Sequence, residues 1–369
     1  MVRKGELGWI IFLAGLPFAP FLNHQLDLWH AHSAWVHLVL MVLVLYATTQ
    51  PHRPMPRPLN WWMLWVTVLS WWLWQASITT SKTYPFALLA SWTHLFTIWL
   101  FVLASMIWDE PLVHSLIRAI RWSGLIMLAY GVLQLANLDQ FFDSGKGRDV
   151  LVGTIGNPSH LAAYFSILLP LYLLGGKRWS PASLVTIGLI LCTKSMTGQL
   201  AMAAVLLWWS LFQPRWVTGL LLAIGGLGLA YLWFHREGLN TWGRWEAWTI
   251  FWNFIKQKSI LGYGPGFTMQ LSQTITERGP IFQWRHCHNE FLQVWLEQGI
   301  VGLGLVIWTV WDAAMRVVRK LPVPHMVALG GMLLAFGINS LLNFPAHLWM
   351  TGSLGLMAYC GIYTLTESA

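Results

Sequence analysis

The chain has 369 residues, of which 56% are hydrophobic and only 10% are charged. A soluble domain contains about a quarter charged residues, so the composition excludes an ordinary soluble protein. The net charge of +8 does not indicate nucleic-acid binding, because Lys and Arg collect on one side of a membrane protein. The three cysteines, Cys192, Cys287 and Cys360, are scattered and odd in number, so they predict no disulfide framework.

Apolar segments long enough to cross a bilayer recur along the whole chain. We therefore predict an all-α, polytopic integral membrane protein with about 12 transmembrane helices. We expect the spans at residues 7–22, 34–49, 60–78, 86–108, 122–138, 158–175, 182–196, 198–213, 216–234, 289–311, 324–343 and 346–366. The seventh and eighth are equally compatible with one helix broken at Thr197 and Gly198.

The distribution of Lys and Arg predicts the orientation. When the N-terminus is placed in the cytoplasm, the inside loops carry most of the basic residues of the short loops, as the positive-inside rule requires. The long polar segment that begins at Arg236 then faces outward. We expect transmembrane helices 1–9 in residues 1–235, an extracytoplasmic catalytic loop at 236–288, and helices 10–12 in residues 289–369.

The outward loop gathers ionisable residues, which marks it as the expected place of the chemistry. Its first part starts at Arg244 and carries Trp248, Phe251 and Ile255 at helical spacing, so we predict an amphipathic helix on the membrane surface. Arg244 suits two tasks, binding a phosphate or reaching lipid headgroups.

The second part of the loop, Ile260 to Phe267, contains three glycines and a proline that force a compact turn. Such a backbone brings N–H donors close to a phosphate, or it only reverses the chain. It is not a Walker loop, because no Gly-Lys-Ser/Thr sequence follows.

The third part of the loop leads from Arg285 into a helix that is predicted to begin near Asn289. His288 would lie at the N-terminus of this helix, where an imidazole suits a general base or merely packs. Glu290 or Glu297 is expected to set the tautomer of His288. The alternation His286-Cys287-His288 matches no standard zinc spacing, so we expect no metal.

Together these motifs resemble the O-antigen ligase and polymerase superfamily. The loop contributes Gly243-Arg244, Trp248, Gly262 to Gly266, and His288 to Gln293 with Glu297 and Gly299. Upstream and downstream elements match as well: Gly153 to Ala162, Thr193 to Gly198, and Asn339 to Pro345. The chain departs from the family pattern at Met196, where the family usually has Arg after its serine, whereas Lys194 precedes the serine.

The resemblance implies a fold related to the GT-C glycosyltransferases. It also implies transfer of a glycan from undecaprenyl pyrophosphate to a hydroxyl of lipid A-core, a growing glycan or a protein, without a cofactor or metal. The enzyme would lie in the bacterial inner membrane with its catalytic loop on the periplasmic face. By position, the family's catalytic groups correspond to His288 and Arg244. Weaker candidates for binding the pyrophosphate or the acceptor are Arg285, Arg278, Arg148, Lys194, Asn289, Glu290, Gly264 and Gly266.

Three other functions remain open. One is a flippase-like or scaffolding partner in envelope assembly, although an inactive relative of that kind would be expected to lose His288 or Arg244, and both are present. A transporter of bicarbonate or another small solute would place polar residues near the midplane of broken helices, where Asn339, Ser340 and Asn343 are modest candidates. A protein O-oligosaccharyltransferase would share the site but use a protein hydroxyl. The charged residues gather in the loop and not in the span centres, which favours an enzyme of cell-envelope polysaccharide assembly, such as lipopolysaccharide biosynthesis.

Overall fold

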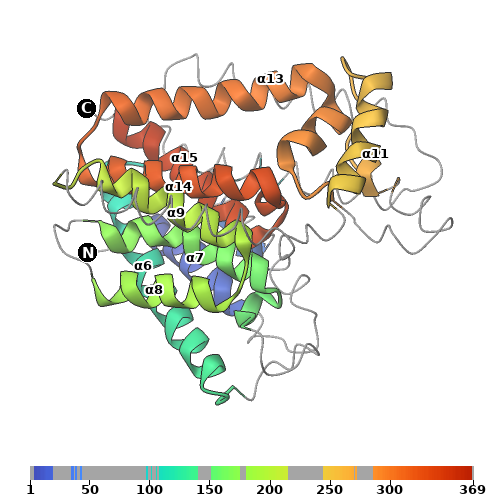
Figure 1. Ribbon diagram of the computed structural model, residues 1–369. Helices are drawn as coiled ribbons and strands as arrows, with labels where there is room; N and C mark the ends of the chain where they lie inside the picture. The colour runs from blue at the N-terminus through green and yellow to red at the C-terminus, as the bar shows by residue number, and fades with distance from the viewer. Residues whose placement is uncertain are drawn as a thin grey trace.

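The computed structural model describes residues 4–19, 35–36, 38–39, 42–43, 97–98, 101, 105, 108–139, 151–174, 180–214, 244–269, 271 and 286–367. These residues form α-helices and short 3-10 helices, and no strand occurs among them (Figure 1). The all-α prediction is therefore confirmed for this part of the chain. The predicted spans 60–78 and 216–234 lie outside the described residues, as do most of 34–49 and 86–108.

Most of the described helices begin and end within a few residues of the predicted spans. The described helices are α1 (Lys4–Gly15), η1 (Leu16–Phe18), α6 (Glu110–Leu135), η2 (Gly153–Ile155), α7 (Pro158–Leu173), α8 (Pro181–Cys192), α9 (Met196–Ser210), α11 (Arg244–Gln257), α13 (Glu290–Arg319), α14 (Pro324–Leu342), η4 (Pro345–His347) and α15 (Trp349–Glu367). The prediction 122–138 is wrong at its start, because α6 begins at Glu110, where the Asp109 side chain caps it by accepting from the Leu112 N–H. Within the described ranges, α6, α13 and α14 are long and apolar enough to cross a membrane. The number of twelve spans stays a prediction.

Side-chain caps in the sequence fix where several helices begin. The side chain of Asn157 accepts a hydrogen bond from the Ser159 N–H at the start of α7, and Ser180 caps α8 in the same way. Both caps are followed by a proline, whose fixed φ suits the first helical position. These local signals explain why the predicted starts of the two helices agree with the structure.

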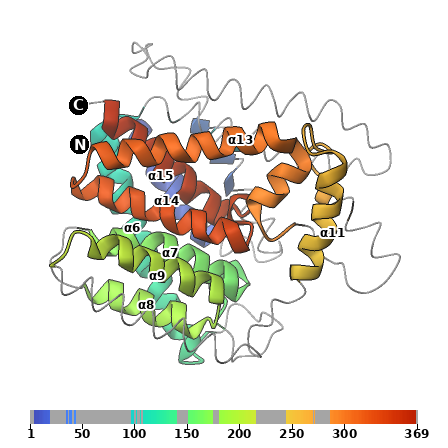
Figure 2. The ribbon, with the colours of Figure 1, turned by 45° about the horizontal axis from the view of Figure 1, so that its top comes forward.

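Helix α7 forms the centre of the bundle and packs against α8, α9, α14 and α15 (Figures 1 and 2). All its side chains from Leu161 to Leu173 are buried. A Cβ added at Gly198 of α9 would lie 2.3 Å from the Cβ of Ala162, so these two helices approach closely. The amide of Asn339 in α14 donates to Ser166 Oγ at 3.0 Å, which links α14 to α7.

The break between α8 and α9 differs from one alternative expected from the sequence. The chain forms two helices, and the break lies at Thr193 to Ser195 and not at Thr197-Gly198. Lys194 adopts a left-handed conformation with φ of 55°, and the Ser195 side chain caps α9 by accepting from the Gly198 N–H. The serine therefore starts a new helix, and Lys194 is exposed in the turn before it.

Helix α13 lies along the outside of the bundle (Figure 2). Five large apolar side chains on it are more than half exposed, and four of them lie close together in the sequence: Ile307, Trp308, Val310 and Trp311, with Val318 further along. A contiguous exposed apolar surface of this kind fits contact with lipid. Near the end of the helix Arg316 pairs with Asp312 at 3.0 Å and with Glu367 of α15 at 3.5 Å, which ties α13 to the bundle.

Candidate functional site

A small second core lies at one end of the bundle, where α11 crosses the beginning of α13 (Figures 1 and 2). Phe251 and Ile255 of α11 are buried in this core with Leu296 of α13 and Cys287. The predicted amphipathic helix is thus confirmed as a helix with one buried face. The opposite face leaves Trp245 63% exposed, as expected of a helix whose other side meets lipid or water.

The beginning of α13 is bent at Gly299, which has φ of 70° and ψ of −173°. A side chain is excluded here, because an added Cβ would lie 2.0 Å from the carbonyl oxygen of Ile260. The bend separates the short segment that starts at Glu290 from the longer part of α13 that follows the bundle. Gly299 therefore sets the direction in which the first two turns of α13 leave the bundle.

The glycine-rich turn closes around this bend. The Tyr263 N–H donates to the Leu296 carbonyl at 2.9 Å, and the Gly264 N–H donates to the Glu297 carbonyl at 2.7 Å. The Ile300 N–H in turn donates to the Ser259 carbonyl at 2.8 Å. These bonds satisfy helix groups that the bend releases. The Gly264 donor is thus engaged within the protein, which supports the chain-reversing role of the turn. The predicted contact of Gly264 and Gly266 with a phosphate stays a prediction.

His288 lies just ahead of α13, two residues before Glu290; the contact described above, between the turn Ser259–Gly264 and the bend at Gly299, is called the clasp below. The helix begins at Glu290 because the Asn289 side chain accepts from the Leu292 N–H at 2.9 Å. His288 itself has φ of 52°, a conformation that costs of order 1–3 kcal/mol for a residue with a Cβ. The predicted position of the histidine at a helix N-terminus is confirmed.

Arg244, the first residue of α11, lies close enough to His288 to affect its titration. Burial, together with the positive charge of Arg244, lowers the pKa of His288 to about 4. Burial also lowers the pKa of the Arg244 guanidinium. One turn further along α11, the indole N–H of Trp248 donates to the Cys287 carbonyl at 2.8 Å. This bond holds the start of α11 beside the His288 segment, so a fixed cation faces a neutral imidazole at pH 7.

Phe344 forms an aromatic wall against which histidines from different segments pack. Its ring lies 4.8 Å from His288 and 5.1 Å from His160 of α7, edge to face in both cases, and it stacks on His286 at 4.4 Å. Phe344 follows α14 directly, so the Asn339–Pro345 element and the Gly153–Ala162 element meet at the loop histidines. Three stretches of the proposed family pattern therefore converge in space.

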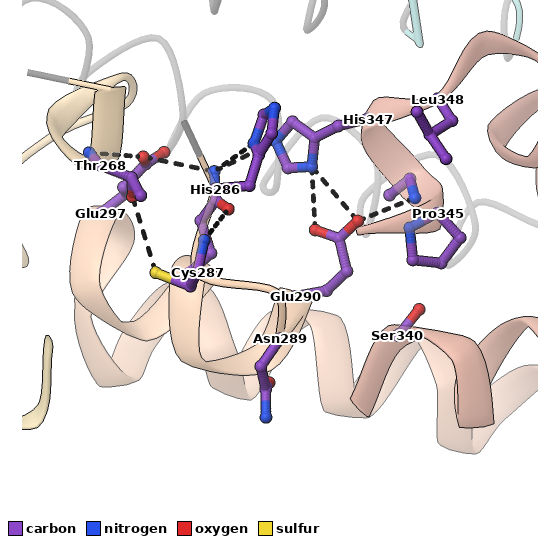
Figure 3. Close-up of polar contacts among 12 residues, drawn as sticks. Thr268, His286, Cys287, Asn289, Glu290, Glu297, Ser340, Pro345, His347 and Leu348 are labelled. Carbon is purple, nitrogen blue, oxygen red and sulfur yellow. Dashed lines mark hydrogen bonds and ion pairs between the residues drawn. The ribbon is translucent and has the colours of Figure 1, made fainter. Parts of the chain in front are cut away.

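A buried polar network continues from His286 into α13 and η4 (Figure 3). Glu290 pairs with His347 Nδ1 at 3.0 Å and accepts from the Ala346 N–H at 2.8 Å. Burial alone would lower the pKa of His347, but the carboxylate of Glu290 outweighs it and the pKa is raised. The Gln293 amide lies 3.4 Å from His347 Nε2 and 3.5 Å from His286 Nδ1.

Glu297 occupies the inner side of the same network. Its carboxylate accepts from the Thr268 N–H at 3.1 Å and from the Gln293 amide at 3.5 Å. The thiol of Cys287 lies 3.8 Å from Thr268 Oγ1, and burial, with the nearby charges of Glu297 and Glu290, raises its pKa well above the usual range. Glu290 and Glu297 thus bind Ala346, His347, Thr268 and Gln293, and the expectation that one of them sets the tautomer of His288 stays a prediction.

Of the other predicted site residues, Asn289 caps α13 and Glu290 pairs with His347. Lys194 lies in the turn before α9, at the end of the bundle where α9 meets the start of α7. Arg148, Arg278 and Arg285 lie outside the described residues. The sequence analysis missed His347 and gave no role to His160. The only feature that could have pointed to them is their position, since His160 lies within the Gly153–Ala162 element and His347 lies just after the Asn339–Pro345 element. Among the described residues, no group of three His, Cys, Asp or Glu side chains could hold a metal ion.

An apolar cavity of about 240 Å³ lies elsewhere, between the end of α7, the end of α9 and the beginning of α14. It is lined by Pro170, Trp208 and Val327 among others. The site residues are at the opposite end of α14, so this cavity is separate from the chemistry.

The apolar helical bundle, with helices long enough to cross a membrane and a polar site at one end, has the features of an integral membrane protein. Residues 181–307 match the family model of O-antigen ligase. The match confirms, for this part of the chain, the resemblance to the O-antigen ligase and polymerase superfamily. It runs from α8 through Arg244, the glycine turn and His288 into α13, and it ends before Phe344 and His347. No curated protein matches the chain.

Proposed function

We propose that the protein is a membrane glycosyltransferase of the O-antigen ligase or polymerase type. It would transfer a glycan from undecaprenyl pyrophosphate to an acceptor hydroxyl in cell-envelope polysaccharide assembly. The observation that carries the proposal is the pairing of Arg244 with His288. These residues are far apart in the sequence, yet they lie together at the end of an apolar bundle that suits a lipid-linked donor.

The pair suits the two requirements of the reaction. A guanidinium binds phosphate oxygens in a bidentate manner and stabilises the charge that builds on a leaving pyrophosphate. A neutral imidazole accepts the proton of the attacking hydroxyl. In this step the acceptor oxygen forms a bond to the anomeric carbon and the bond from that carbon to the pyrophosphate oxygen breaks. The hydroxyl proton moves to His288, and the lipid pyrophosphate leaves with the electron pair.

Binding of the donor would also make His288 a better base. Free His288 is a weak base, because burial and the charge of Arg244 hold its pKa at about 4. A pyrophosphate bound to Arg244 adds negative charge beside the imidazole, and nearby negative charge raises the pKa of a histidine. The proton acceptor would thus become effective when the donor is in place.

The predicted orientation gains support from the basic residues at the other end of the bundle. The site lies where α14 ends, whereas Arg319 and Lys320 lie just before α14 begins, about 28 Å away along a 19-residue helix. Basic residues favour the cytoplasmic side. We therefore propose that the site faces the periplasm from the bacterial inner membrane.

Transport is less well supported. The amide of Asn339, one of the polar residues expected near the midplane, donates to Ser166 and to the Ala335 carbonyl. It therefore serves as an interhelical link. A protein hydroxyl as acceptor stays compatible with the same site.

The test is transfer of a radiolabelled glycan from undecaprenyl pyrophosphate in proteoliposomes, with lipid A-core, free glycan and a serine-containing protein offered as separate acceptors. We expect His288→Ala and Arg244→Ala each to lower the rate about 10²–10⁴-fold. Lys256→Ala, a change at the far end of α11, is the matched control and should leave transfer unchanged. Full activity of both site variants would contradict the proposal.

A further inference from the structure

The Glu290 side chain fastens the turn after α14 to the start of α13. Both carboxylate oxygens of Glu290 lie near His347 Nδ1, at 3.2 and 3.0 Å, and Oε1 also accepts from the Ala346 N–H at 2.8 Å. Glu290 is only 7% exposed. A buried carboxylate with an ion-pair partner and a backbone donor is a strong link, because releasing either partner leaves a buried charge poorly compensated.

This link fixes the position of Phe344, which directly precedes the fastened turn. The Phe344 ring packs on His286 at 4.4 Å and on His288 at 4.8 Å. His347 also lies 4.6 Å from the His286 ring. Movement of the turn away from α13 would therefore remove the wall on which the His288 imidazole rests.

Gln293 provides a second path from His347 to His288. Its Oε1 accepts from the Cys287 N–H at 3.2 Å, so its amide nitrogen faces His347 Nε2 at 3.4 Å. When His347 is neutral and donates its Nδ1 hydrogen to Glu290, its Nε2 accepts from the Gln293 amide. The bond to the Cys287 N–H then holds the peptide between His286 and Cys287, one residue before His288, which has a left-handed backbone conformation.

We propose that Glu290 and His347 form a positioning clamp that holds Phe344 and Gln293, and through them the imidazole of His288. His347 is a positioning residue and does not touch the reacting atoms. The functional consequence rests on the proposed role of His288 in glycosyl transfer.

The first test separates positioning from folding. His347→Ala removes the Nδ1 donor, whereas His347→Asn keeps an N–H at a similar place for Glu290. We expect His347→Ala to lower kcat for transfer about 100-fold, because displacement of a catalytic group by about 1 Å commonly has this effect, with the donor KM nearly unchanged. His347→Asn should restore most of the rate. His325→Asn, at the other end of α14, is the matched control and should behave like the unmodified protein.

The second test does not depend on activity. Deuterium exchange at the imidazole C2 position, followed by mass spectrometry, reports the pKa and accessibility of each histidine in the intact protein. We expect His347→Ala to raise the pKa of His288 from about 4 towards its ordinary 6.5, because a displaced imidazole moves away from Arg244 and gains water. His347→Asn should leave the pKa of His288 as it is.

Unchanged exchange of His288 together with an unchanged transfer rate in His347→Ala would overturn the clamp. Equal damage from His347→Ala and His347→Asn would also overturn it, because the donor to Glu290 would then have no special part. Full activity of His288→Ala would instead overturn the proposed function, and the exchange measurement would still decide whether the clamp exists.

Discussion

The bend at Gly299 makes a sharp prediction. In Gly299→Ala the new methyl group would meet the carbonyl oxygen of Ile260 at 2.0 Å, and alanine would have to adopt φ of 70° and ψ of −173°. This backbone region costs of order 1–3 kcal/mol for a residue with a side chain. Relief of the clash requires the turn to move, which breaks the bond from the Ile300 N–H to the Ser259 carbonyl, worth about 1 kcal/mol. We expect a total cost of about 3 kcal/mol.

Amide hydrogen exchange measures this cost locally. Because about 1.4 kcal/mol corresponds to a tenfold change in an equilibrium constant, we expect the Ile300 amide to exchange about 100-fold faster in Gly299→Ala, while amides in α7 stay protected. Gly304→Ala is the matched control in the same helix, since nothing lies within 4 Å of an added Cβ there. It should be neutral or stabilise α13 by up to about 1 kcal/mol. Equal exchange at Ile300 in the two variants would refute the clasp.

Three further changes test the site by simpler measurements. His288 is held neutral by a lowered pKa, so its burial costs stability wherever the unfolded chain binds the proton and the folded chain does not. The free energy of unfolding should therefore fall as the pH drops from 6.5 towards 4. His288→Asn should flatten that part of the curve of stability against pH. An identical curve for the variant would contradict the lowered pKa of His288. Trp248→Phe removes the indole donor to the Cys287 carbonyl, so it should lower the free energy of unfolding by about 1 kcal/mol and also lower kcat. Trp245→Phe, on the exposed face of α11, should change neither. Equal effects of the two variants on thermal unfolding and on transfer would show that Trp248 does not anchor α11. Asn289→Ala should destabilise α13 by about 1 kcal/mol, whereas Asn289→Asp should keep the cap and the stability. If the aspartate variant is fully stable but loses transfer, Asn289 binds substrate and is not merely a cap.

The sequence predicted the helices well where local signals were strong. Proline after Asn157 and Ser180 marks the beginnings of α7 and α8, and the apolar spacing after Arg244 defines α11. It also placed His288 correctly at the start of α13, because apolar residues recur at helical spacing after Asn289. These features depend on residues within a few positions of one another.

The remaining parts of the site depend on pairs that are far apart in the sequence. Nothing near Glu290 indicates that its carboxylate meets His347, 57 residues later. The role of the glycine turn was also ambiguous in the sequence, since a compact glycine-rich turn can bind a phosphate through its N–H groups or can simply reverse the chain. Only the structure shows that the Gly264 N–H bonds to the bend in α13.

The wall at Phe344 has a consequence for how the protein becomes active during its biogenesis. His160 lies in the first turn of α7, His288 precedes α13, and Phe344 follows α14. The three rings therefore meet only when the corresponding ends of these helices emerge on the same side of the membrane. A chain with one of these helices inserted in the opposite direction would separate the rings by the thickness of the bilayer. Assembly of the site would therefore depend on correct insertion, and a misinserted chain would carry all the residues of the site without forming it.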